Sequence, residues 1–247
     1  MNRVGRAAVM ILLGLVMARL LENGSFGFFI QQRMRIPLLL ATIVLIALGL
    51  YEGYAGIRQE NRDPASIDRS TAPKVGWLMV LPLLIIFSVA PTGLGAAAAE
   101  RVEAFTPVEP EEDFDRFEDL DTSNGIPELR VIDFVNRAIW DEDASLRGET
   151  VRLEGLVVND PDVPNGFLLT RFLVSCCAAD GIPVQVAVRD VNQAFADDTW
   201  VVADVVWREP VVPYIEIEDD IWHVDVDLVG ITVDANPPTD AYESPYE

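Results

Sequence analysis

The sequence has few of the side chains that most often carry out chemistry. Its 247 residues include two cysteines, one histidine and a single lysine, Lys74, against seventeen arginines. It lacks the GxSxG, HExxH, phosphate-loop and CxxC motifs of hydrolases, zinc peptidases, nucleotide-binding enzymes and thiol oxidoreductases. These absences argue against an enzyme of any of those classes. We therefore expect a protein that binds or assembles and does not catalyse a reaction.

Charge divides the chain near residue 100. Residues 1–100 hold nine basic and six acidic side chains, whereas residues 101–247 hold nine basic and 34 acidic ones. The second part therefore has a net charge of −25 and the first a net charge of +3, which sum to the −22 of the whole chain. Such a surface repels polyanions, so nucleic acid is not an expected partner.

Three apolar stretches lie in the first hundred residues. The third, at residues 75–96, belongs to a run of 25 uncharged residues, longer than the roughly 20 needed to cross a bilayer. The second covers residues 36–55. The first, residues 7–21, contains Arg19, whose side chain can reach the lipid head groups. We predict three transmembrane helices, with a cleaved signal peptide as the alternative for the first.

Basic residues near these stretches indicate an orientation. Six lie near the N-terminus or between the second and third spans, and three lie at the end of the first span or between the first and second. Positively charged loops remain cytoplasmic, so we expect a multi-pass protein of the cell membrane with its C-terminal domain extracytoplasmic. The six are Arg3, Arg6, Arg58, Arg62, Arg69 and Lys74, and the three are Arg19, Arg33 and Arg35.

Residues 100–127 separate the membrane region from the rest of the chain. They contain a dense acidic run, several prolines and few large apolar side chains. This composition predicts a solvated, extended linker. The alternative is an acidic collar that attracts cations near a pore mouth.

Residues 128–247 predict a small, mainly β domain outside the membrane. Residues 128–140 place apolar side chains at helical spacing and indicate one amphipathic helix. Short alternating runs follow, with turn residues between them and no β–α–β rhythm. Five or six such strands with one helix favour an OB-like barrel. The runs are residues 149–158, 166–176, 182–188, 199–207, 214–218 and 223–233.

Three segments resemble the YcgQ-type family of bacterial membrane proteins, whose function is unsettled. They read FFIQQRMRIPLLL at the start of the second span, LVSCCAADGIPV, and GITVDANPPTDAYESPYE at the C-terminus. The most specific feature is the cysteine–cysteine–alanine–alanine–aspartate motif. The resemblance implies an accessory subunit of a predicted multi-span permease. The motif positions are Cys176, Cys177, Ala178, Ala179 and Asp180.

The adjacent cysteines suggest a site that binds a soft metal ion or a thiol-reactive ligand. Two thiolates and the Asp180 carboxylate suit Zn²⁺ or Cu(I) better than Mg²⁺ or Ca²⁺. The single histidine, His223, completes a ligand set if its strand runs near residue 176, and Asp225 and Asp227 share its strand face. Spacing alone argues against such a site, because adjacent side chains of a strand point apart.

Two alternatives to metal binding remain open. Outside the cytoplasm the two thiols tend to oxidise, and a bridge between neighbours closes a strained, reducible ring that suits a redox regulator. In the other alternative, one cysteine packs inside the barrel and the second lies at the surface. The protein is then a structural interaction subunit.

Overall fold

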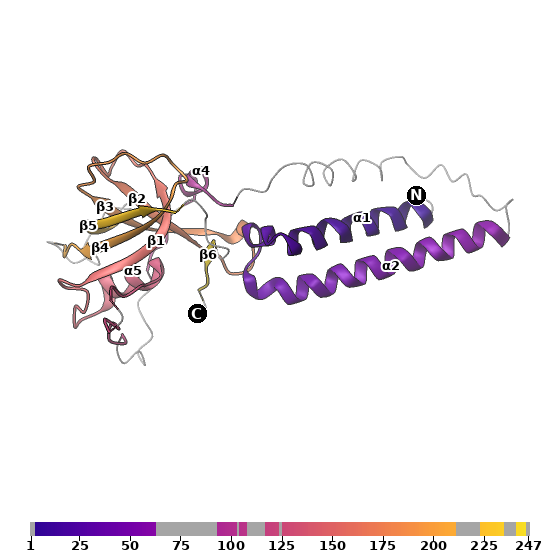
Figure 1. The fold of residues 1–247 in the computed structure, drawn as a ribbon, viewed down its shortest axis with the longest axis horizontal. Helices are drawn as coiled ribbons and strands as arrows, with labels where there is room; N and C mark the ends of the chain where they lie inside the picture. Colours follow the sequence, from indigo (N-terminus) through magenta and orange to yellow (C-terminus); the bar gives the residue numbers. More distant parts are fainter. Residues whose placement is uncertain are drawn as a thin grey trace. The chain divides into compact units, whose positions relative to one another are not determined.

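The computed structural model of the chain divides into two compact units, residues 1–92 and 93–247. It describes residues 3–62, 93–102, 104–107, 117–123, 125–210, 223–234 and 241–245 (Figure 1). The first unit is helical, and the second is a β-barrel with one main helix.

The first unit is a hairpin of two long helices. Its elements are α1 (Arg3–Glu22), the 3₁₀ turns η1 (Ser25–Phe28) and η2 (Gln32–Met34), and α2 (Arg35–Arg62). Glycines allow the two helices to approach closely. A Cβ atom added at Gly14 would lie 2.5 Å from Ile46 Cγ1, and one added at Gly49 would lie 2.7 Å from Ile11 Cγ1. Small residues at such contacts are typical of helices that pack within membranes.

One helix in the described part of the chain, Gln32–Arg58, is long and apolar enough to cross a membrane. It contains the predicted span at residues 36–55. The predicted span at residues 7–21 lies in α1, but the 20 residues of that helix include three arginines and Glu22. The predicted span at residues 75–96 lies outside the described residues as far as Thr92. The structure thus supports one membrane-crossing helix where the sequence predicts three.

The second unit contains a closed five-stranded barrel. The ring order is β1–β4–β5–β3–β2, and pairing of β1 with β2 closes it. Neighbouring strands of the ring are antiparallel except β3 and β5, which are parallel. This arrangement fits the OB-like barrel that the sequence predicts. The strands are β1 (Thr150–Val158), β2 (Phe167–Leu173), β3 (Ile182–Arg189), β4 (Trp200–Trp207) and β5 (Val224–Val233).

Gly155 is the position at which the barrel closes. Residues 150–156 of β1 pair with β4, and residues 156–158 pair with β2, so β1 changes partner at this point. A Cβ atom at Gly155 would lie 2.8 Å from the Thr170 carbonyl oxygen on β2. Only glycine permits this close approach of two strands.

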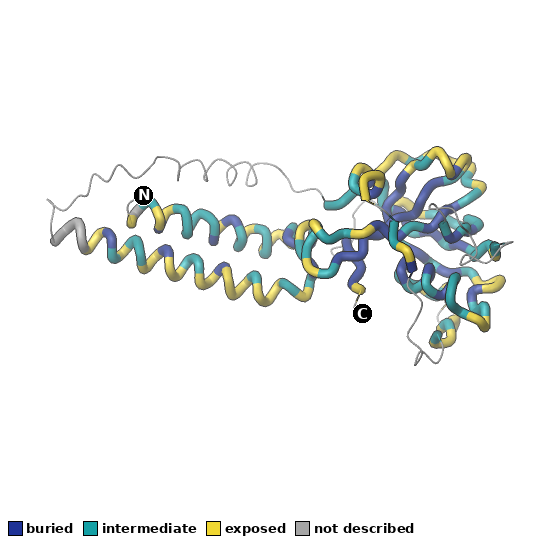
Figure 2. The backbone as a smooth tube through the Cα atoms, turned by 180° about the vertical axis from the view of Figure 1, so that it is seen from behind, coloured by how far each residue is buried: buried dark blue, intermediate teal, exposed yellow. Residues whose placement is uncertain are grey.

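Alternation along the strands builds the core. Alternate side chains of β1 and β4, and Val224 and Val226 at the start of β5, are almost fully buried, and β2 is buried on both faces (Figure 2). Helix α5 (Val131–Trp140) contributes apolar side chains to the same core. It confirms the helix predicted at residues 128–140. The predicted strand at residues 214–218 lies outside the described residues.

The described parts of the acidic linker contact the second unit. The side chains of Phe105 and Leu120 lie against the core, and the Phe105 N–H donates to the Pro183 carbonyl oxygen at 2.8 Å. The guanidinium of Arg137 lies 5.1 Å from the centre of the Phe117 ring. A few apolar side chains spaced along a polar segment therefore attach it to the domain.

Candidate functional site

The two cysteines lie in the connection between β2 and β3. The last residue pair of these strands is Leu173 and Ile182, so residues 174–181 project from the end of the barrel. Ala178–Asp180 form a 3₁₀ turn, η5, and the Asp180 N–H donates to the Cys177 carbonyl oxygen at 2.9 Å. The strand predicted through Cys176 therefore ends three residues earlier, and the chain turns back directly after the cysteines.

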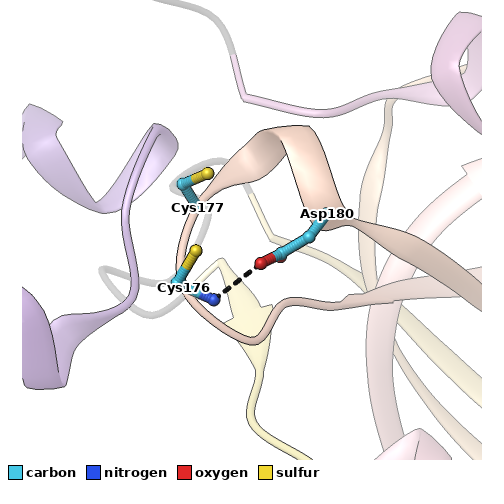
Figure 3. A group of neighbouring side chains, drawn as sticks. All are labelled: Cys176, Cys177 and Asp180. Atoms are coloured by element: carbon cyan, nitrogen blue, oxygen red, sulfur yellow. Dashed lines mark hydrogen bonds between the residues drawn. The ribbon is translucent and has the colours of Figure 1, made fainter.

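Hydrogen bonds to the Asp180 carboxylate fix the shape of this loop. One carboxylate oxygen accepts the Ser175 N–H at 3.0 Å. The other accepts the Cys176 N–H at 2.9 Å, and Figure 3 shows this second bond. The turn through Ala178 and Ala179 returns the aspartate to the residues that precede it. This local arrangement places a carboxylate beside two thiols.

The Cys176 sulfur, the Cys177 sulfur and an Asp180 oxygen all lie within 4.8 Å of one another. Cys176 is exposed and Cys177 is half-buried, and neither forms a disulfide. Tetrahedral zinc separates two sulfur ligands by about 3.8 Å, given Zn–S bonds of about 2.3 Å. Small side-chain rotations are therefore enough to bring the three atoms around one ion. The two sulfur atoms thus lie near each other, unlike the side chains of adjacent residues in a regular strand, although the backbone of Cys177 is itself extended.

Hydrogen bonds within the loop shift the pKa values of Asp180 and Cys176 in opposite directions. Burial acts to raise the pKa of Asp180, but hydrogen bonds from the Cys176 thiol and from nearby backbone N–H groups outweigh it and lower that pKa. The same thiol hydrogen bond, together with one to Cys177, raises the pKa of Cys176 to about 11. Cys176 is therefore a protonated thiol at neutral pH, bound to a carboxylate.

His223 does not belong to this group of three residues. It lies just before β5. Burial lowers the pKa of its imidazole, and the negative charge of Asp160, which acts to raise that pKa, only partly offsets this effect. The carboxylates predicted on its strand face are engaged elsewhere. Asp225 pairs with Arg189 at 2.8 Å, and Asp227 pairs with Arg208.

The C-terminal segment adds residues near the loop that the sequence did not indicate as part of a site. Tyr242–Glu243 form a short strand, β6, which runs parallel to the end of β2. The Val174 N–H donates to the Glu243 carbonyl oxygen at 2.9 Å, two residues before Cys176. This segment belongs to a motif that supports the family resemblance, which is the only signal the sequence offered.

Fold and site together define an OB-like domain with a thiol–carboxylate loop at one end of its barrel. The family model of the DUF1980 C-terminal domain matches residues 134–219. The matched range begins within α5, includes β1 to β4, and contains the loop with both cysteines. The match fits the resemblance to YcgQ-type proteins. No curated protein and no solved structure matches the chain at a significant level.

Proposed function

We propose that this chain is a membrane-anchored accessory subunit of a permease and that its OB-like domain binds a soft metal ion. The ligands are the thiolates of Cys176 and Cys177 and the carboxylate of Asp180. The observation that carries the proposal is the grouping of these three ligand atoms within 4.8 Å on one hydrogen-bonded loop.

The chemistry of the ligand set favours Zn²⁺ or Cu(I). Thiolate sulfur is a soft ligand, whereas Mg²⁺ and Ca²⁺ prefer oxygen ligands alone. The negative charges that keep the Cys176 proton in place also attract a cation, and metal binding releases that proton. His223 is not part of the proposed set, because its charged neighbours are Asp160 and other groups away from the loop.

Two observations favour metal binding over the alternative functions. The Asp180 carboxylate lies within 4.8 Å of both sulfur atoms, and a carboxylate is a metal ligand that a redox pair of thiols does not require. Cys176 is exposed and Cys177 is only half-buried, so neither is packed inside the barrel as the structural alternative requires of one of them. The redox regulator and the structural subunit remain the second and third candidates.

Membrane anchoring is supported by α2. Many large apolar side chains of this helix are exposed, including Leu40, Ile43 and Val44, and a lipid bilayer is the medium that suits such a surface. We propose three spans with the barrel domain outside the cytoplasm, on the basis of loop charge. The permease partner rests on the family resemblance. Nucleic acid is not a proposed partner, because of the acidic charge of residues 101–247.

The metal content of the purified chain tests this proposal. We expect the full chain, purified in detergent without oxygen, to hold about one equivalent of zinc or copper. The variant with Cys176→Ser and Cys177→Ser is expected to lose it. The matched control is Asp162→Asn, which alters an exposed aspartate in the loop between β1 and β2. A metal-free wild-type chain that takes up no zinc or Cu(I) on titration would contradict the proposal.

The permease partner and the topology need separate tests. A tagged full chain in mild detergent is expected to co-purify with a multi-span transporter. Recovery of no membrane transporter would count against that part of the proposal. A reporter fused after Glu247 is expected to be active outside the cytoplasm, and a strong cytoplasmic signal would contradict the proposed orientation.

A further inference from the structure

The cysteine loop is held at both of its ends by segments distant in sequence. At the first end, the Glu243 carbonyl oxygen accepts the Val174 N–H at 2.9 Å. At the second end, a Cβ atom added at Gly181 would lie 2.4 Å from Leu94 Cδ1, so the Leu94 side chain lies directly against the loop. The loop is therefore in contact with the C-terminal segment and with the first residues of the domain.

The C-terminal segment also joins these two contacts to each other. The Tyr242 hydroxyl oxygen accepts the Leu94 N–H at 3.0 Å. Tyr242 is buried, and it pairs with Phe172 through the parallel ladder between β6 and β2. Leu94, the end of β2 and the loop thus form one connected set of contacts.

Glu243 anchors the same segment to the rest of the domain. Its carboxylate accepts the Val131 and Ile132 N–H groups, at 2.8 Å and 3.0 Å, at the first turn of α5. Arg171 of β2 lies 3.7 Å from this carboxylate, and the carbonyl oxygen of Ser244 accepts a hydrogen bond from Arg130 at 3.0 Å. We call residues 241–245, with these contacts, the C-terminal clasp.

We propose that Tyr242 and Glu243 are positioning residues for the cysteine loop, residues 174–181. The C-terminal clasp then couples metal binding in this loop to residues 93–99. This inference rests on the proposed metal binding at Cys176, Cys177 and Asp180. Residues 93–99 join the domain to the N-terminal part of the chain, so the coupling gives the metal state of the barrel a route towards the membrane region.

The physical basis is preorganisation. An ion that gathers three side chains of one loop restricts that loop, and the free energy of this restriction reduces affinity. A clasp that already holds both ends of the loop lowers that cost. Coupling is reciprocal, so a metal ion that binds better when the clasp is closed also stabilises the closed clasp. We call the clasp closed when the Leu94 N–H is hydrogen-bonded to the Tyr242 hydroxyl oxygen. Protection of the Leu94 N–H from exchange therefore reports the closed state.

Two variants separate positioning from folding. Tyr242→Phe removes only the oxygen that accepts the Leu94 N–H and leaves the ring in the core. Glu243→Gln is more disruptive, because an amide has one oxygen for two backbone donors, so it is the secondary variant. The matched control is Glu209→Gln, which removes an exposed carboxylate paired with Arg147 at 2.6 Å.

The test uses the full chain in detergent with Co²⁺ as the metal probe. Thiolate-to-cobalt absorption measures binding, and amide hydrogen exchange at Leu94 measures closure of the clasp. In the wild-type chain we expect Co²⁺ to slow exchange at Leu94. In Tyr242→Phe we expect affinity for Co²⁺ to fall about 3- to 10-fold, as for the loss of one buried hydrogen bond, and the slowing to disappear. Glu209→Gln is expected to behave as wild type.

The possible failures are distinguishable. If the wild-type chain binds Co²⁺ through thiolates but exchange at Leu94 is unchanged by the metal, the clasp coupling is wrong and metal binding stands. Equal Co²⁺ affinity in the wild type and Tyr242→Phe also overturns the positioning role. If the wild-type chain binds neither Co²⁺ nor Zn²⁺, the proposed function fails and the inference fails with it.

Discussion

The Asp180 carboxylate has two roles in the loop between β2 and β3. Its oxygens accept the backbone N–H groups that shape the loop, and they lie beside the sulfur atoms of both cysteines. The motif suggested the ligand types, but the rule that adjacent side chains of a strand point apart was applied to residues that lie beyond the end of β2, before the turn η5. Sequence alone could not locate the end of β2, because its apolar run continues to Val174 without a turn residue.

Removing the Asp180 charge is expected to make Cys176 more reactive. Hydrogen bonding to Asp180 is the largest cause of the raised thiol pKa, so Asp180→Asn should move it from about 11 towards the ordinary value of 9.0. The rate of Cys176 alkylation as a function of pH measures this shift, with Cys177→Ser present in both chains so that one thiol reacts. Asp162→Asn serves as the control. An unchanged pH profile would show that Asp180 does not govern the thiol.

His223 offers a separate residue-scale test, because it is the single histidine of the chain. Burial lowers the pKa of His223 in the folded chain below its ordinary value of 6.5, which applies to the unfolded chain. As the pH falls, the unfolded chain therefore binds a proton at this residue before the folded chain does. The contribution of His223 to stability is therefore present above pH 6.5 and is lost as the pH falls through the folded-state pKa. An NMR titration of its ring protons measures that pKa directly. A value above 6.5 would contradict the buried environment of the imidazole.

At the scale of elements, the barrel closes through β1, which pairs with β4 along most of its length and with β2 at its end. Five strands and α5 could be predicted from alternation and helical periodicity, since each is long enough to show its pattern. The two-residue strand β6 could not be predicted, because two residues show no period. The partner change at Gly155 is a long-range event that local patterns do not contain.

Gly155→Ala is expected to destabilise the domain. The new methyl group would lie 2.8 Å from the Thr170 carbonyl oxygen and 3.1 Å from Leu169, so two paired strands must separate. We expect a loss of about 1–3 kcal/mol in the free energy of unfolding, as for overpacking in other cores. Gly230→Ala is the matched control, because its Cβ would meet nothing nearer than 3.7 Å. Chemical denaturation of both variants measures the difference, and equal stabilities would contradict the proposed closure.

At the scale of the whole molecule, a helical hairpin and an acidic barrel domain lie on one chain. The charge pattern predicts a division near residue 100, and the second unit of the structure begins at Gly93. Residues 93–99 read as the end of an apolar run in the sequence. In the fold they belong to the domain, since the Ala96 N–H donates to the Asp198 carboxylate at 2.6 Å.

Membrane anchoring through α2 leads to a whole-molecule prediction. Val44 lies near the middle of the apolar helix and is exposed, so Val44→Arg places a charge where lipid is expected. On insertion scales this costs about 2.5–3.5 kcal/mol, and we expect less of the chain in the membrane fraction of cells. Arg58→Gln, at the end of the helix, is the control. Equal membrane fractions for both variants would argue against α2 as an anchor.

X-ray absorption at the zinc edge of the zinc-loaded full chain tests whether Cys176 and Cys177 hold the ion. We predict about two sulfur neighbours at about 2.3 Å and oxygen or nitrogen neighbours at about 2.0–2.2 Å. The sulfur signal should vanish in the chain with Cys176→Ser and Cys177→Ser. A wild-type spectrum without sulfur neighbours would show that the adjacent cysteines do not hold the ion and would contradict the proposed metal site.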